Sequence, residues 1–458
     1  MDIKKRFTVV FSAVIVLMIT ACARDGFSQW VSDTTKNTPV CTASNAQQHP
    51  KACTDGRDGI IIVWEDFRNN HWDVYAQKLD YGGYAQWTSN GVQLCQNNNT
   101  KTQPVIATDG SGGAYVVWLE QRRGSGQLDL YGQHILSNGS LGYGTKGFAV
   151  DSVPNTPESA TSPANAAICE DDNGNAFVVW EDNRTAITLS SRPDIYGNFL
   201  TSSGPAWGKS GAPVIAFTSR QNTPKIIPDG NGGAYLAWIS GANVPQSIQV
   251  TRLNNSGYST WGNNGVEVYA GANGTADISR NPSLTRDGNQ LVISWETLNS
   301  SNSAKGYDVY ANRFSSSGTP IWGSASSPVS ISNNWNGDQT NSIIFTDDSV
   351  VSSTGNSGIM VVYQNDASKN AISMTRVIGD GSTDVPAYPN HIFTVCYENA
   401  SDGSVANQTN PVAVKTGTGE ILAAWVDGRL STSSTTVSSI YAQRLDKTPR
   451  RYLGPNPS

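Results

Sequence analysis

Charged residues and histidines are scarce in this chain of 458 residues, and this limits the chemistry that it can carry out. Only 15% of the residues are charged, and four are histidines. None of the histidines belongs to a nucleophile or metal motif, and no cysteine spacing resembles that of a zinc site. The sequence therefore indicates no catalytic residue, no metal and no cofactor, and it favours a binding role over an enzymatic one.

Long basic runs and long apolar runs are also missing after the N-terminal segment. Beyond residue 22 no run of Lys or Arg is longer than two residues, so a nucleic acid is not an expected partner. No second apolar run approaches the roughly 18 residues that a membrane-spanning helix needs. No later stretch keeps a helical hydrophobic period over eleven residues, so we expect almost no helix.

Residues 1–22 have the features of a lipoprotein-like signal peptide. Lys4, Lys5 and Arg6 precede an apolar run over residues 7–19, and the segment ends in Ile-Thr-Ala-Cys, which resembles the lipobox of bacterial lipoproteins. In that case Cys22 is the site of lipid attachment, and a lipid is the only expected link to a membrane. Simple cleavage at an Ala-x-Ala type of signal is the alternative. Either way we expect export, as an outer-surface lipoprotein or as an extracellular protein.

One unit recurs along the rest of the chain. It contains a short strand, a Pro-x-x-x-x-Asp-Gly segment, an apolar strand that ends in Trp, and an Asp-(Ile/Val/Leu)-Tyr strand. Successive copies are 54 to 68 residues apart, which leaves room for four short strands with their turns. The apolar strands of the seven copies end at Trp64, Trp118, Trp180, Trp238, Trp295, Tyr363 and Trp425.

The repeat predicts how the chain is organised. A four-stranded sheet of this size cannot bury both of its faces alone, so neighbouring copies must stack. Closure into a ring removes the need for polar capping repeats, and the first and last units look like ordinary copies. We therefore predict an all-β fold, a seven-bladed β-propeller of four-stranded antiparallel blades over residues 30–446. We expect a monomer, followed by a C-terminal tail over residues 447–458.

Two repeated motifs admit both a binding and an architectural interpretation. An acid and an arginine follow the apolar strand, as in Glu65-Asp66 with Arg68, and could form an ionic ring for a ligand. The architectural alternative is that the arginine pairs with the Asp that opens the next strand, such as Asp73. The Asp-Gly-x-Gly-Gly turns have too few oxygen ligands for calcium and are expected to be structural, with residues 170–173 as the one partial exception.

The cysteines that follow Cys22 are odd in number, so they cannot all pair within one molecule. Cys41 and Cys53 lie on successive strands of one unit and form the one candidate disulfide. Cys53 and Cys169 stand where Ala107 stands in another unit, which is typical of a small apolar core residue instead.

The chain resembles the secreted bacterial β-propeller repeat proteins with Trp-Glu-Asp-x-Arg motifs that occur in bacteria with type IX secretion. Trp64 to Arg68 and Trp180 to Arg184 carry the motif, and the resemblance covers about nine tenths of the chain. Those proteins usually end in a sorting domain that opens with Pro-Asn-Pro. Here the chain stops at Pro455-Asn456-Pro457-Ser458, so the tail is either the start of an absent or truncated sorting domain or an ordinary flexible end.

Three functions are compatible with these features. The first is a non-catalytic surface or secreted module that binds a glycan or a protein. The second is a glycan-processing enzyme, because the converging carboxylates of such enzymes need not be close in sequence. The third is a passive structural module of a longer adhesin-like protein. Trp335 lies outside the repeated Trp positions, in the most divergent unit, and is the candidate binding residue; Trp72 is a weaker one.

The lipobox makes a direct prediction about the attachment of the protein to membranes. We expect Cys22→Ser to release the protein from the membrane fraction of its native kind of host, because the substitution removes the lipid acceptor. Fractionation of cells expressing the wild type and the variant measures this. Equal membrane association of both proteins would contradict the lipoprotein interpretation.

Overall fold

The computed structural model describes fifteen segments of the chain, and every structural statement below concerns these segments. They are residues 39–123, 128–152, 163–184, 193–217, 219–241, 246–269, 277–298, 306–323, 327–332, 336–366, 371–382, 392–396, 407–415, 421–427 and 439–445. Their regular elements are all β-strands, and no helix long and apolar enough to cross a membrane occurs among them. The all-β prediction is confirmed.

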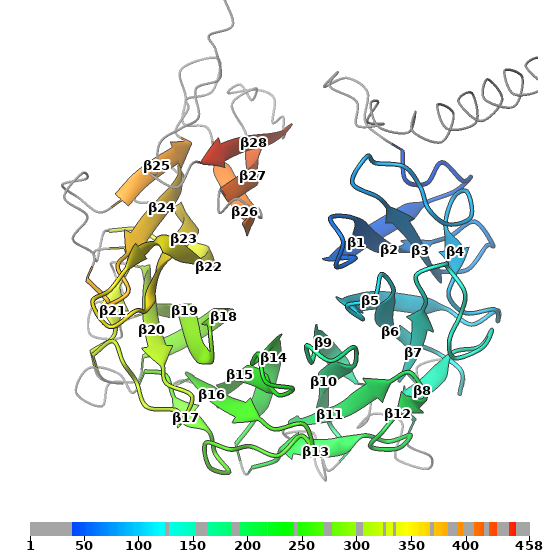
Figure 1. Cartoon of the computed structure of the whole chain (residues 1–458), viewed down its shortest axis with the longest axis horizontal. Coiled ribbons are helices and arrows are strands. Elements are labelled where there is room, and N and C mark those ends of the chain that lie inside the picture. The colour runs from blue at the N-terminus through cyan, green and yellow to red at the C-terminus, as the bar shows by residue number, and fades with distance from the viewer. Residues whose placement is uncertain are drawn as a thin grey trace, which may run out of the picture. The chain divides into compact units, whose positions relative to one another are not determined.

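The described strands form seven small antiparallel sheets, which we number in chain order (Figure 1). Sheet 1 contains β1 (Gln47–Thr54), β2 (Ile60–Asp66), β3 (Asp73–Leu79) and β4 (Val92–Gln93). Sheet 2 contains β5 (Lys101–Thr108), β6 (Ala114–Glu120), β7 (Asp129–Ile135) and β8 (Phe148–Asp151). Sheet 3 contains β9 (Ala164–Glu170), β10 (Ala176–Asp182) and β11 (Asp194–Thr201), and both β12 (Gly204–Pro205) and β13 (Ala212–Ile215) pair with β11.

The remaining sheets repeat this order. Sheet 4 contains β14 (Gln221–Pro228), β15 (Ala234–Ser240), β16 (Ser247–Leu253) and β17 (Val266–Glu267). Sheet 5 contains β18 (Ile278–Asp287), β19 (Gln290–Leu298), β20 (Tyr307–Phe314) and β21 (Val329–Ser330). Sheet 6 contains β22 (Gln339–Val351), β23 (Ser357–Asn365), β24 (Ala371–Val377) and β25 (Ile392–Cys396). Sheet 7 contains β26 (Gln408–Lys415), β27 (Ile421–Asp427) and β28 (Ser439–Leu445).

The chain divides into two compact units, one within residues 1–118 and 133–147 and the other within residues 119–132 and 148–458. The first unit holds sheet 1 and part of sheet 2, and the second holds sheets 3 to 7. Each unit is described by itself.

The order of strands within a sheet differs from the sequence prediction in one respect. We expected the short strand to open each unit, but β4 pairs with β3, so it closes the sheet that precedes it in the chain. Sheet 1 therefore begins with the proline-containing strand, followed by the Trp strand and the Asp-x-Tyr strand, and the other sheets keep the same order of strands. The reason is that the loop after the Asp-x-Tyr strand leads directly into the short strand. The outer edge of the Asp-x-Tyr strand is available for pairing there.

The tryptophans that end the second strands lie in the core, as predicted. Their exposed fractions are between 0 and 4% at the six positions Trp64, Trp118, Trp180, Trp238, Trp295 and Trp425. In the second unit the apolar clusters lie between consecutive sheets; one joins Tyr235 and Trp261 of sheet 4 to Trp295 and Phe314 of sheet 5. Stacking of sheets, rather than the faces of one sheet, therefore supplies the core.

A second set of tryptophans, located just after the third strands of several sheets, binds to the next sheet, as Trp261 of sheet 4 and Trp322 of sheet 5 show. The indole of Trp261 donates a hydrogen bond to the carbonyl of Ser316 at 2.9 Å, in the turn that ends the third strand of sheet 5. In that turn a Cβ on Gly318 would lie 2.8 Å from the Trp261 ring, and its φ is +87°. Only glycine permits both the close approach and this backbone conformation. Trp322 makes the same contact with sheet 6, through the carbonyl of Gly379 and a close approach to Gly381.

Every first strand carries a left-handed residue at the same place, and in the six registers that the structure gives it coincides with a β-bulge. The φ angles lie between +48° and +54° at His49, Gln103, Asn165, Thr223, Asn281, Asn341 and Asn410. The strand registers shift at this point, for example between Asn222 and Lys225 in sheet 4. Such a bulge bends the strand and leaves the backbone N–H of the left-handed residue unpaired within its own sheet.

At three of these bulges a buried glutamate of the preceding sheet accepts that N–H. Glu181 in sheet 3 accepts from the backbone of Thr223 at 2.6 Å, and Glu296 in sheet 5 accepts from Asn341 at 2.7 Å. In the first unit Glu65 accepts from Gln103 at 2.7 Å. These three glutamates are at most 7% exposed. We call this contact the glutamate latch; it satisfies a buried carboxylate and a bulge amide together.

Thr223 is the one β-branched residue at the left-handed bulge position. A branched Cβ is strained at a φ of +48°, and the buried Thr223 hydroxyl has no hydrogen-bond partner among the described residues. We expect Thr223→Asn to raise the free energy of unfolding by about 1 kcal/mol, because asparagine tolerates this conformation. Chemical denaturation measures the change. Thr223→Val, which keeps the branched Cβ, is the control. A loss of stability in Thr223→Asn as large as that in Thr223→Val would contradict this explanation.

Candidate functional site

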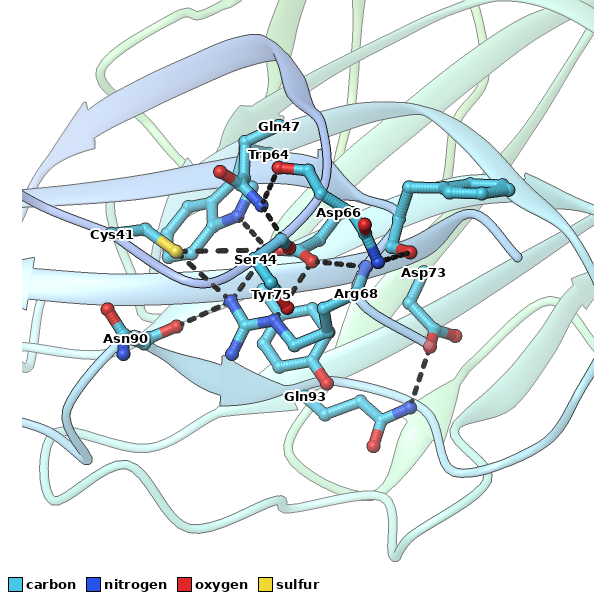
Figure 2. Close-up of polar contacts among 12 residues, drawn as sticks. Cys41, Ser44, Gln47, Trp64, Asp66, Arg68, Asp73, Tyr75, Asn90 and Gln93 are labelled. Atoms are coloured by element: carbon cyan, nitrogen blue, oxygen red, sulfur yellow. Dashed lines mark hydrogen bonds and ion pairs between the residues drawn. The ribbon is translucent and has the colours of Figure 1, made fainter. Parts of the chain in front are cut away.

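The Trp-Glu-Asp-x-Arg motif forms a closed polar cluster in sheet 1 (Figure 2). Trp64 donates its indole N–H to Asp66 at 2.9 Å, and Arg68 donates from Nε to the same carboxylate at 2.9 Å. The guanidinium of Arg68 also lies 3.8 Å from the centre of the Tyr75 ring. Burial opposes ionisation of Asp66, but the hydrogen bonds from Arg68 and Trp64 outweigh it and lower the pKa of the carboxyl. The cluster is internally satisfied, which is the architectural interpretation.

The partner of the arginine differs from the one that we predicted. We expected Arg68 to pair with Asp73, but it pairs with Asp66 at 2.6 Å. Asp73 is instead held by the fully buried ammonium of Lys101 at 2.7 Å and by the Gln93 amide at 3.0 Å. In sheet 2 two adjacent arginines divide these roles, since Arg122 binds Glu120 and Arg123 binds Asp129. The prediction of the partner was wrong because Asp66, only two positions before Arg68, binds the guanidinium.

Sheet 3 repeats the cluster and adds a carboxylate. Arg184 contacts Asp182 and also Asp151 at 2.7 Å. Burial, together with the charge of Asp182, raises the pKa of Asp151 to about 7 against the opposing effect of Arg184. Arg184 also donates to the carbonyl of Ser210 at 2.7 Å and stacks on Tyr196 at 4.0 Å. A guanidinium surrounded in this way is not free to bind an anionic ligand.

The Asp-Gly turns at the other end of the strands are structural. Asp109 accepts hydrogen bonds from the backbone of Ser111 and Gly113 at 2.8 Å each, and its second oxygen meets His134 at 2.9 Å. The corresponding aspartates of sheets 1 and 4 pair with Lys78 and Arg252. Clusters of three or more possible metal ligands do not occur in the described part of the chain.

In the segment at residues 170–173, our partial exception, the carboxylates of Asp171 and Asp172 are engaged. Asp171 accepts from the backbone of Asn173 and Asn175 at 2.8 and 2.9 Å. Asp172 pairs with Arg286 at 3.1 Å. Burial, with the neighbouring Asp172 charge, raises the pKa of Glu170. These carboxylates brace the turn and its neighbour, so the segment does not present a set of free ligands.

The predicted disulfide between Cys41 and Cys53 is not formed. Cys41 is a free thiol whose sulfur accepts from Arg68 Nη2 at 3.1 Å, as Figure 2 shows. Cys169 is a buried thiol in the apolar cluster between sheets 3 and 4, and burial raises its pKa. Cys169 therefore acts as a small apolar residue, as the alignment with alanine indicated.

The predicted binding and lipid-attachment residues are not in the described segments. Trp335 and Cys22 both lie outside them, as do residues 1–38 and 446–458. The weaker candidate Trp72 is half-buried, with its ring 5.1 Å from the ring of Phe67. Trp72 therefore packs within its loop rather than forming an open platform for a sugar.

The strongest candidate for a ligand site is a cavity of about 510 Å³ in the second unit. We call it the first-strand cavity, because the described residues that line it come from the first strands of all five sheets of that unit. Its exposed polar contributors are Lys225, Asn281, Asn341 and Asn410, and Val412 is 63% exposed beside them. Carboxylates are not among the lining residues that the structure describes.

The bulges explain why these side chains meet. Asn281, Asn341 and Asn410 are the left-handed residues of β18, β22 and β26, so each bulge turns an amide towards the same surface. The Asn281 amide donates to the buried Glu296 carboxylate at 3.1 Å, which fixes its orientation. The sequence contains a signal for this surface, an Asn at one fixed place in the repeat that precedes Pro in two of the three sheets, but we missed it because we looked for residues that depart from the repeat.

Comparisons with known proteins do not assign the chain. No family model matches it, and no curated protein matches. A solved polysaccharide lyase, Uly1, is 7% identical, with 93% of each chain covered and a TM-score of 0.47. A protein of unknown function from Dyadobacter fermentans is 9% identical, with 88% of this chain and 96% of that chain covered and a TM-score of 0.41. An exo-1,5-α-L-arabinanase from a bovine ruminal metagenomic library is 13% identical, with 61% and 97% covered and a TM-score of 0.31. TM-scores below 0.5 are too low to transfer a fold or a function.

Proposed function

We propose that this protein is an exported, non-catalytic binding module built as a seven-bladed β-propeller, and that the first-strand cavity binds a glycan. The single observation that carries the proposal is the convergence of bulge amides from three sheets on one cavity. A glycan matches this surface because its hydroxyls can both donate to and accept from amides. The half-exposed aliphatic side chains beside the amides, such as Leu284 and Ile343, suit the apolar faces of sugar rings.

The architectural part of the proposal rests on the repetition of one sheet plan. The described sheets share the same strand order, and consecutive sheets in each unit pack through their first strands. The glutamate latch and the second tryptophan recur between them. Repetition of one sheet plan, with similar contacts recurring between consecutive sheets, favours a closed ring over an open array.

The chemical nature of the cavity supports binding rather than cleavage. Glycoside hydrolysis commonly uses two carboxyl groups that flank the scissile bond. The described residues that line the cavity offer amide, hydroxyl, ammonium and apolar groups instead. The nearby Glu296 is fully buried and occupied by Asn341 and Asn281, so it supports the wall and does not face a ligand.

A glycan array tests the proposal with a variant that removes the three amides and keeps the backbone. Asn281→Gly, Asn341→Gly and Asn410→Gly combined should lower glycan binding at least about tenfold, because glycine accepts the left-handed φ without a side chain. The matched control is Gln103→Gly with Asn165→Gly, which changes the same bulge position outside the cavity. We expect the control to bind like the wild type at a similar melting temperature.

Three outcomes of the same experiment would contradict the proposal. Equal binding by the triple variant and the wild type would remove the cavity from the account. If the wild type binds no glycan and captures a host protein instead, the ligand is a protein and not a glycan. Release of shortened sugars from a bound glycan would show that the protein is an enzyme.

A further inference from the structure

A second cavity of about 710 Å³ lies beside sheet 4, at the end where β15 stops and β16 starts. Its lining includes Trp238, Ser240, Gln249 and Glu267, and it shares no residue with the first-strand cavity. The strand registers identify what occupies this place elsewhere. Trp238 pairs with Gln249, and Gln249 with Glu267, as Trp64 pairs with Tyr75 and Tyr75 with Gln93 in sheet 1. The cavity therefore corresponds to the site that Arg68 fills.

The residues that normally close this site are replaced in sheet 4. Ser240 stands where Asp66 stands in sheet 1, and Gln249 stands where Tyr75 stands. The Ser240 hydroxyl bonds to Ser219 at 3.1 Å rather than to the indole. Arg68 follows Asp66 by two residues, and the residue two after Ser240 is Ala242, so sheet 4 lacks the acceptor, the cation and the aromatic ring of the repeated cluster.

The loss leaves a buried donor without a partner. Trp238 is 0% exposed, and its Nε1 has no hydrogen-bond partner among the described residues. The corresponding indoles of Trp64, Trp180, Trp295 and Trp425 all donate, at 2.9 Å, to an acceptor two residues further along the strand. An unpaired buried N–H is unfavourable, so a group that enters the cavity with an acceptor gains this bond.

The other lining groups define the chemistry of that ligand. Glu267 is an exposed carboxylate, and it is the one charged group among the described lining residues, so an anionic ligand is disfavoured. Gln249 adds an amide, and Phe217 adds a half-buried aromatic ring. A hydroxyl can accept from Trp238 and donate to Glu267, and the apolar face of a sugar ring can pack against Phe217.

We propose that this cavity binds one neutral sugar residue, with a hydroxyl oxygen of the sugar accepting from Trp238 Nε1 and another hydroxyl donating to Glu267. The volume is within the range of ligand pockets and suits a monosaccharide or the end of a longer glycan. In sheet 4 the repeated cluster leaves the indole of Trp238 unpaired, and the sugar hydroxyls take the places of the acceptor and the cation.

Saturation-transfer NMR and calorimetry with the methyl glycosides of glucose, galactose, mannose, xylose and N-acetylglucosamine test this inference on the wild type. We expect at least one probe to bind, and Trp238→Phe to weaken it at least about tenfold by removing the N–H. Glu267→Gln should weaken it by a similar factor. The matched control is Trp295→Phe, the same change in sheet 5, where Thr297 already accepts the indole N–H; this variant should bind like the wild type.

Two further variants keep the result interpretable. Ser240→Thr places at this position the residue type that accepts the indole in sheet 5, and we expect weaker sugar binding because the Thr hydroxyl would take the indole N–H. The triple glycine variant of the first-strand cavity should leave this binding intact, so failure of the two sites can be told apart. Absence of binding by all five probes, or equal binding by the wild type and Trp238→Phe, would overturn the inference.

Discussion

One kind of contact joins sheets 1 and 2, sheets 3 and 4, and sheets 5 and 6: the hydrogen bond between a buried glutamate and the backbone amide of a left-handed residue in the next sheet. A carboxylate buried to the extent of Glu296 requires strong donors, and a bulge amide requires an acceptor from outside its own sheet. The hydrogen bond between them satisfies both groups. The contact also sets the position of one sheet against the next, because the bulge occurs at a single place in each first strand.

The same constraint explains where functional surfaces can arise. The bulge that supplies the amide of the latch also turns asparagine side chains towards one surface. The first-strand cavity is therefore a consequence of the architecture. The cavity at sheet 4 has the opposite origin, since Ser240 and Gln249 replace residues that elsewhere close the cluster. A repeat fold can thus offer a surface to which several sheets contribute and a pocket that arises from substitutions in one sheet.

Much of the fold, but less of the site, follows from the sequence. The buried tryptophans and the order of the three longer strands are readable because the apolar strands recur at regular spacing, whereas the place of the short strand is not. The partner of Arg68 is not readable, because Asp66 and Asp73 face each other across the hairpin and only the fold shows that Lys101 takes Asp73. The sequence reveals that sheet 4 lacks the Asp-x-Arg pair. It does not reveal that the Trp238 indole stays buried and unpaired, because that depends on the side chains packed around it.

Hydrogen exchange at the bulge amides tests the latch most directly. The account predicts that the amides of Gln103, Thr223 and Asn341, which donate to glutamates, exchange at least about tenfold more slowly than the amide of Asn281. Asn281 occupies the same left-handed position, but the residue of sheet 4 that aligns with the latch glutamate is Ile239, which has no acceptor side chain. Exchange of all four amides at one common rate would contradict the claim that the glutamate latch joins the sheets.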